Sequence, residues 1–156
     1  MRYAISEAKR KIVGRLEMGD LLPDALLKVC ALHKISSAQV HALGAVNYLE
    51  VTEWDVQAGK YRDGLVRDGM AEIIMLYGNI SYKEDEPFAH LHISASFHEN
   101  GKTEMIAGHL VKAKVFACEY VIDALDDLVL TRTKDDETGL WLWDSVQKKG
   151  FRGPSI

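Results

Sequence analysis

The most constraining feature of this chain is a run of alternating residues that ends in a strong turn signal. Between His90 and Phe97, histidine or serine alternates with leucine, isoleucine, alanine or phenylalanine. Such period-two alternation is typical of a β-strand with one buried face. Asn100-Gly101 follows, and this pair favours a two-residue type I′ turn because both residues tolerate positive φ. The sequence therefore predicts an antiparallel hairpin whose second strand begins at Lys102.

The turn also sets a register in which Glu99 pairs with Lys102 and His92 pairs with His109. Directly opposed Cβ atoms lie roughly 4.5–5.5 Å apart, and His90 lies one pleat along on the same face. Three imidazoles from two neighbouring strands can bind a tetrahedral metal ion and leave one position open. We therefore predict metal ligands at His90, His92 and His109. Alternation on a solvent-exposed strand face is the competing interpretation, and a slip of one residue would turn His109 away.

The other residues of this region have simpler interpretations. The same register places Leu91 opposite Leu110 on the apolar face. His98 has the parity of the predicted ligands but adjoins the turn, so we interpret it as a surface residue. His33 ends a predicted helix and His41 lies in a predicted strand, and both are interpreted as structural.

Composition points to one globular domain with a substantial core. The chain has 156 residues, of which 47% are hydrophobic and 27% charged, as is usual for water-soluble proteins. We predict a single domain over residues 1–156, with its core at about 12–143 and a C-terminal tail at 144–156. The net charge of −4 argues against a protein that grips the phosphate backbone with its whole surface.

Two cysteines and the absence of long apolar runs bear on the compartment. Cys30 and Cys118 provide no disulfide framework and no metal-binding pair, so we expect reduced packing residues in a cytoplasmic protein. No segment has the length and apolar character of a signal peptide core or a membrane span.

Patterning along the chain predicts mostly strands. A helix is expected after Gly19, with Asp20 as its N-cap, and residues 63–69 are expected to form a loop. Residues 72–82 are predicted to be a central strand buried on both faces, with a bulge or close backbone approach at Gly78. Residues 120–129 fit a strand or a helix. The other predicted strands are residues 2–5, 12–18, 35–46, 48–56, 128–133 and 140–143.

The order of several short motifs resembles the PPC domain, a domain shared by plants and prokaryotes. The resemblance covers roughly residues 12–143. The motifs that carry it are Gly14-Arg15-Leu16-Glu17, Gly19-Asp20, Ile35-Ser36-Ser37-Ala38, Gly44-Ala45-Val46, Leu76-Tyr77-Gly78-Asn79-Ile80-Ser81, His90-Leu91-His92 and Gly108-His109-Leu110.

This resemblance implies a fold, an assembly and a metal. The fold would be α+β, with a mostly antiparallel β-sheet packed with helices, and the assembly a homotrimer. The free-standing prokaryotic members imply a zinc site at His90, His92 and His109. The same fold is known from acetolactate decarboxylase, a zinc enzyme with a three-histidine site, although a shared fold does not fix function.

The resemblance also implies an association with DNA, but the residues that would carry it are missing. Plant members bind AT-rich DNA through an Arg-Gly-Arg-Pro motif outside the domain, and this chain has no such motif. Residues 151–154 (FRGP) are interpreted as an ordinary polar tail. The basic group Lys9-Arg10-Lys11 with Arg15 is interpreted as a solvated edge rather than a nucleic-acid contact.

Three functions from different classes remain open on the sequence. The first is a trimeric, DNA-associated regulatory or binding module. The second is a zinc-dependent enzyme of the lyase or decarboxylase type that acts on a small molecule and needs an acid or base. Its candidate groups are Glu17, Glu50, Tyr77 and Glu119. The third is a structural trimer that holds no metal.

Overall fold

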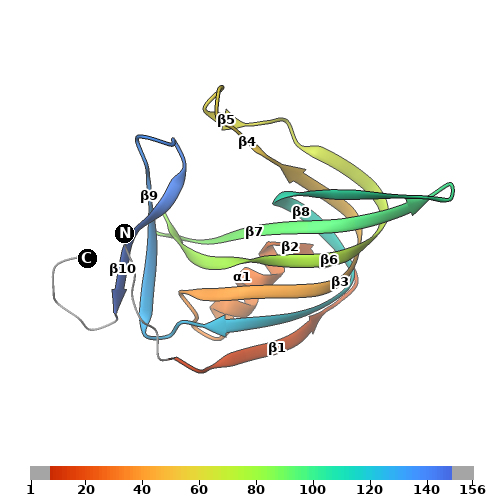
Figure 1. Cartoon of the computed structure of the whole chain (residues 1–156). Helices are drawn as coiled ribbons and strands as arrows, with labels where there is room; N and C mark the ends of the chain where they lie inside the picture. Colours follow the sequence, from red (N-terminus) through yellow and green to blue (C-terminus); the bar gives the residue numbers. More distant parts are fainter. Residues whose placement is uncertain (1–7, 149–156) are drawn as a thin grey trace.

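The computed structural model describes residues 8–148, which form ten β-strands and one helix (Figure 1). In chain order the elements are β1 (Lys11–Leu16), β2 (Leu21–Leu22), α1 (Asp24–Leu32), β3 (Ala38–Thr52), β4 (Trp54–Asp55), β5 (Lys60–Tyr61), β6 (Leu65–Lys83), β7 (Glu86–Glu99), β8 (Lys102–Ala124), β9 (Leu128–Lys134) and β10 (Trp141–Lys148). The predicted strand at residues 2–5 and the tail residues 151–154 lie outside the described residues.

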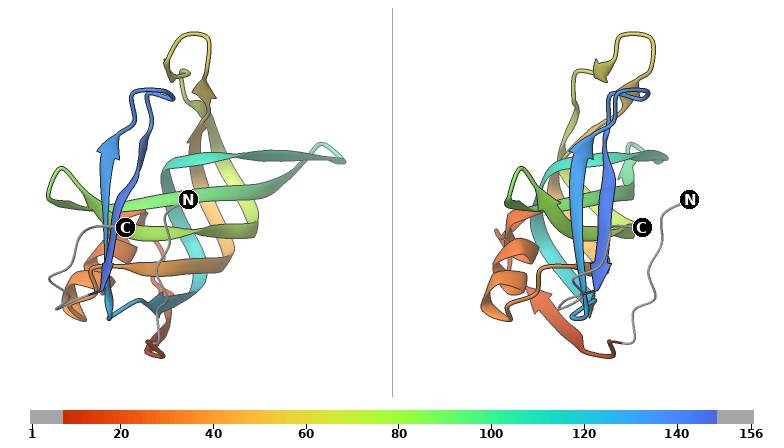
Figure 2. Two further views of the ribbon diagram at one scale, coloured as in Figure 1. Left: turned by 60° about the vertical axis from the view of Figure 1, so that its left-hand side comes forward. Right: turned by 90° about the vertical axis from the view of Figure 1, so that its left-hand side faces the viewer.

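Four long strands close on one another to give a barrel-like core. β3 pairs with β6, β6 with β7, β7 with β8, and β8 with β3, all antiparallel. β8 can pair twice because it is 23 residues long: its first part follows β7 and its later part follows β3. Figure 2 shows how these strongly curved strands wrap around the interior. The mostly antiparallel sheet predicted from the sequence is confirmed.

One short parallel contact joins the C-terminal hairpin to this core. β9 pairs antiparallel with β10, while its residues Thr131 and Arg132 pair in parallel with Tyr82 and Lys83 of β6. The β9–β10 hairpin and the β4–β5 hairpin extend from the same side of the molecule (Figures 1 and 2). The tip of the β9–β10 hairpin approaches the base of the β4–β5 hairpin, since a Cβ added at Gly139 would lie 3.3 Å from the Trp54 ring.

The helix lies where the sequence predicts it but begins later. α1 begins at Asp24 and its N-cap is Pro23, so the prediction of Asp20 as N-cap is wrong. Leu21 and Leu22 first form β2 against β8, and the carboxylate of Asp20 instead accepts a hydrogen bond from the backbone N–H of Glu17. α1 is the one helix among residues 8–148, so helical packing on the sheet is limited to this element there.

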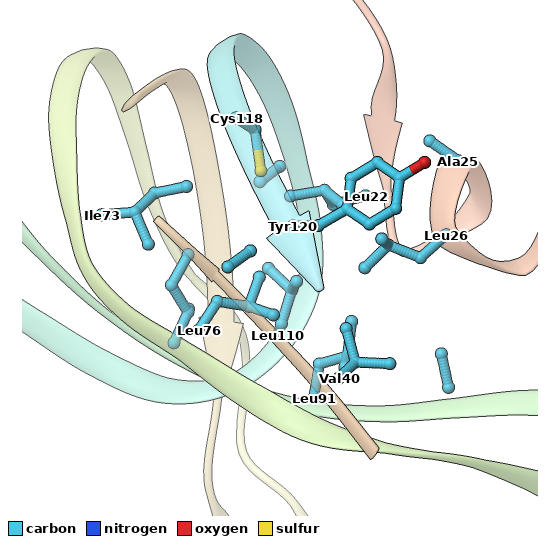
Figure 3. Packing of buried hydrophobic residues seen from close by; sticks show 14 of the residues in the cluster. Leu22, Ala25, Leu26, Val40, Ile73, Leu76, Leu91, Leu110, Cys118 and Tyr120 are labelled. Atoms are coloured by element: carbon cyan, nitrogen blue, oxygen red, sulfur yellow. The ribbon is translucent and has the colours of Figure 1, made fainter. Parts of the chain in front are cut away.

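The interior is a single apolar cluster that the helix seals. Leu26 and Cys30 of α1 are buried and belong to one cluster that includes side chains from every long strand of the core. Figure 3 shows Leu22 and Leu26 beside Tyr120 and the strand residues beneath them. Cys30 and Cys118 are both buried free thiols, as predicted, and burial raises the pKa of each to about 11.

No helix in the described part of the chain is long and apolar enough to cross a membrane.

Bulges explain where the strand predictions fail. Residues 35–46 and 48–56 are not two strands, because β3 runs unbroken from Ala38 to Thr52 with register shifts after Ala42 and Val46. Each shift changes which face a side chain occupies, and this interrupts the alternation in the sequence. Residues 63–69 are not all loop, since β6 already begins at Leu65 and pairs with β3.

β6 is also less buried than its apolar run suggests. The prediction of burial on both faces is wrong, because Ile74 and Met75 stand on an outward face and are 51% and 58% exposed. Residues 120–129 are resolved in favour of strand: β8 continues to Ala124 and β9 begins at Leu128. The strand predicted at residues 140–143 is present and extends to Lys148 as β10.

The close backbone approach predicted at Gly78 is confirmed and generates a test. A Cβ at this position would lie 2.0 Å from the backbone oxygen of His90, so β6 and β7 would have to separate. We expect Gly78→Ala to lower the free energy of unfolding by about 2–4 kcal/mol, at or above the usual cost of overpacking. Chemical denaturation measures this. Glu72→Ala, an exposed change in the same strand, should cost less than about 1 kcal/mol, and equal costs would contradict the explanation.

Candidate metal centre

The hairpin predicted from Asn100-Gly101 is present in the predicted register. Both turn residues have positive φ, 51° and 73°, as a type I′ turn requires. Glu99 pairs with Lys102 and His92 with His109. The predicted pairing of Leu91 with Leu110 is wrong, because β8 leaves β7 after His109 and Leu110 pairs with Val51 of β3.

This register brings His90, His92 and His109 together. Their ring centroids lie 5.0 Å apart for His90 and His109, 5.1 Å for His90 and His92, and 5.6 Å for His92 and His109. One nitrogen of each ring can be chosen so that all three lie within 4.8 Å of one another. His90 and His109 are half-buried and His92 is exposed, so the cluster is open to solvent on one side.

The surroundings keep two of these rings neutral. Burial, reinforced by the positive charge of Arg132 and by the neighbouring imidazoles, lowers the pKa of His90 to about 4. Burial, with His92 and Arg132, likewise lowers the pKa of His109 to about 4. Both are therefore unprotonated at neutral pH, which is the form that can give a lone pair to a metal ion.

The donor set fits a metal ion. Nδ1 of His109 is buried and has no hydrogen-bond partner, and such an orphaned atom is costly unless something else satisfies it. Three imidazole nitrogens on two strands are the protein ligands that open zinc sites use. His90, His92 and His109 could thus hold a divalent ion, with zinc suited to an all-nitrogen set.

A cavity of about 670 Å³ opens beside the cluster. Its walls come from the β4–β5 hairpin, the end of β6, the parts of β7 and β8 that carry the histidines, and the β9–β10 hairpin. Besides the three histidines it is lined by Thr52, Glu53, Trp54, Tyr61, Lys83, Phe88, Ala107, Gly108, Arg132, Gly139, Leu140, Trp141 and Leu142. The Tyr61 ring lies 5.3 Å from that of His109.

Sequence reasoning missed most of this wall. Of the four acid or base candidates, Glu17, Glu50, Tyr77 and Glu119, none lines the cavity. Tyr77 pairs with His92 across β6 and β7 but does not line the cavity. The cavity instead presents Glu53 and Tyr61. Both belong to the short hairpin region after β3, and nothing local in the sequence indicates that this region folds over the histidines.

The remaining candidate residues lie apart from the cluster. His98 is exposed beside the turn, with Nδ1 3.0 Å from the Thr103 hydroxyl, as the surface interpretation predicts. His33 is the C-cap of α1 and His41 is an exposed residue of β3. In the basic group, Arg10 pairs with Asp126 and Lys11 with Asp123, while Arg15 pairs with Glu17 at 3.1 Å.

Fold and site together define a small antiparallel β-protein with a three-histidine cluster, able to hold a metal ion, at the mouth of a cavity. The family model of the Plants and Prokaryotes Conserved (PCC) domain matches residues 3–126. The chain belongs to this family, also written PPC. All three histidines lie inside the matched segment, whereas Arg132 and the β9–β10 hairpin lie beyond it.

Solved structures agree with this assignment. A metal-containing protein from Archaeoglobus fulgidus is 30% identical, with a TM-score of 0.84 over 92% of this chain and 99% of its own. A PPC protein from Pyrococcus horikoshii is 26% identical, with a TM-score of 0.83 over 94% and 99%. A protein from Bacteroides thetaiotaomicron, provisionally described as DNA-binding, is 26% identical, with a TM-score of 0.77 over 86% and 91%. Comparison with curated proteins gave no match.

Proposed function

We propose that this protein binds one divalent metal ion, zinc in the first place, through His90, His92 and His109, and that the metal takes part in binding a small molecule in the adjoining cavity. The observation that most supports this proposal is the buried Nδ1 of His109, which has no hydrogen-bond partner and lies within a cluster of three imidazoles. The similar protein from Archaeoglobus fulgidus is described as metal-containing, which supports the proposal.

The cavity residues suit the handling of a small molecule. A bound zinc ion would act as a Lewis acid that polarises an oxygen of the ligand. Trp54, Tyr61 and Trp141 place aromatic rings on the wall of the cavity, as is common in small-molecule pockets. The carboxylate of Glu53 and the hydroxyl of Tyr61 line the cavity and could accept or donate a proton.

An enzyme of the lyase type is the extension of this proposal, supported by Glu53 and Tyr61 and by the kinship with the acetolactate decarboxylase fold that the resemblance implies. Such an enzyme would show turnover that requires both metal and Glu53. Turnover of the same substrate by metal-free protein would rule out this extension.

The metal site has a direct test. Purified protein supplied with zinc should hold about one ion per chain. His92→Ala and His109→Ala should each weaken zinc binding by more than about 100-fold, because the loss of a ligand should exceed the 10–100-fold cost of losing a supporting group. Competition with a chromophoric chelator and elemental analysis measure this. His98→Ala is the matched control and should bind as the wild type does. A wild-type stoichiometry near zero would leave the structural-trimer hypothesis.

Association with DNA is the second candidate, favoured by the description of the Bacteroides thetaiotaomicron protein. The described surface gives it limited support, because Arg10, Lys11 and Arg15 are each paired with a carboxylate. We expect any binding to be of the non-specific, electrostatic kind, weak and steeply dependent on salt. A mobility-shift titration with an AT-rich and a GC-rich duplex tests it, and no shift even at low salt would eliminate it.

We further propose that the chain, as a single domain of residues 1–156, assembles into a homotrimer. An outward apolar patch supports this assembly. Leu43 of β3 lies opposite Ile74 and Met75 of β6, inside the bulge between the pairs Ala42–Leu76 and Gly44–Ile73. Leu43, Ile74, Met75 and Tyr77 are all about half exposed or more. Contiguous exposed apolar surface of this kind is typical of protein interfaces.

The assembly can be tested by charging the patch. We expect light scattering to give the mass of three chains for the wild type. Ile74→Lys combined with Met75→Lys should shift the mass to one chain, because burial of unpaired charges at an interface is costly. Leu32→Lys, at the exposed end of α1, is the matched control and should stay trimeric. A monomeric wild type, or a double variant that remains trimeric, would contradict this interface.

A further inference from the structure

We propose that Arg132, assisted by Lys83, forms a carboxylate-binding subsite in the cavity, so that the ligand of this protein is a small organic carboxylate with an apolar, preferably aromatic, body. The inference rests on the proposed metal-dependent function and names its ligand class. Arg132 lies outside the segment that the family model matches, so the subsite is argued from this structure alone.

Arg132 is a buried cation without a counter-ion. The residue is 7% exposed, and no carboxylate among residues 8–148 pairs with it. Its bonds are to neutral groups: Nε donates to the hydroxyl of Ser81 at 2.9 Å, Nη1 to the backbone oxygen of Trp141 at 2.7 Å, and Nη2 to the side-chain oxygen of Asn79 at 2.8 Å. Buried charges are normally paired, and desolvation lowers the pKa of this guanidinium.

Two of the five N–H groups of Arg132 are available for a ligand once a metal is bound. Nη2 has a second bond to Nδ1 of His90 at 3.3 Å, and one N–H of Nη1 has no partner in the described structure. A neutral imidazole has a single lone pair, which His90 gives either to Arg132 or to a metal ion. Metal binding by His90 therefore takes away the acceptor of Arg132 and leaves one free N–H on each terminal nitrogen. A carboxylate can accept both.

The fold places a second cation beside the first. The parallel contact of β6 with β9 pairs Lys83 directly with Arg132. The ammonium of Lys83 stands 4.7 Å from the centre of the Trp141 ring and 5.4 Å from that of Phe88, over the cavity wall. With a divalent ion bound, the cavity would contain that ion and two side-chain cations. Glu53 is the one carboxylate among the lining residues. This balance favours an anionic ligand.

The walls define the rest of the ligand. Trp54, Tyr61, Phe88 and Trp141 line a cavity of about 670 Å³, which suits an apolar or aromatic body rather than a hydrated ion. Arg132 is hydrogen-bonded to His90. A carboxylate bound to Arg132 would therefore be separated from the proposed metal position by no more than the His90 ring. Metal and carboxylate should consequently stabilise each other's binding, and by the same factor in both directions.

The test uses benzoate and its neutral analogue benzamide as probes. Zinc affinity is measured first, without any ligand. Calorimetry on zinc-loaded wild type should then show benzoate binding at least about tenfold tighter than benzamide, as expected for charge-assisted hydrogen bonds. Benzoate should raise zinc affinity by the factor by which zinc raises benzoate affinity.

Variants separate Arg132 from direct coordination of benzoate by the metal. Arg132→Gln should reduce the preference for benzoate by about tenfold or more, Arg132→Lys should retain part of it, and Arg15→Gln, a surface control, should leave it unchanged. Equal preference in wild type and Arg132→Gln, with zinc bound, would overturn the subsite and leave the proposed metal function intact.

Two further measurements keep the proposal decidable. If the Arg132 variants fail to fold, Lys83→Met should still weaken benzoate binding severalfold, and the ¹⁵N side-chain signals of Arg132 in the wild type should shift on titration with benzoate; signals that stay fixed overturn the subsite. If zinc does not bind, the proposed metal function fails. The subsite then fails with it, because His90 keeps its hydrogen bond to Nη2 of Arg132 when no metal is bound.

Discussion

The pairing of His92 with His109 is the contact on which the rest of the site depends. It exists because Asn100 and Gly101 both adopt positive φ, which fixes the register of β7 against β8. A shift of one residue would turn His109 to the opposite face. With the register in place, two strands present three imidazoles to one opening, and burial keeps the rings of His90 and His109 neutral.

The barrel-like core provides the rigidity that such a cluster needs. β8 leaves β7 immediately after His109 and continues along β3, so this histidine stands where two parts of the closed sheet meet. Gly78 allows β6 to approach the backbone of His90, which ties the other side of the cluster to the core. Ligand-binding side chains on paired strands are positioned more accurately than side chains on loops.

The two hairpins beside the cluster add charged and aromatic side chains to the three histidines. The β9–β10 hairpin contributes Arg132, a buried cation whose bonds are to neutral groups, and the β4–β5 region contributes Glu53 and Tyr61. The three-histidine cluster, two cations and aromatic walls in one cavity are the features from which we infer a site for a small anion. The ion pairs of Arg10 and Arg15 leave less positive charge for a nucleic acid.

The sequence by itself determined the hairpin, its register and the three histidines, because alternation and an Asn-Gly turn are local signals. It also located the helix, though not its N-cap, since the pairing of Leu21–Leu22 with β8 is a long-range contact. Only the tertiary structure decided that β3 is one bulged strand and that Lys83 and Arg132 lie side by side. Their pairing joins residues 49 positions apart through a two-residue parallel contact, and so short a contact leaves no periodic pattern in the sequence.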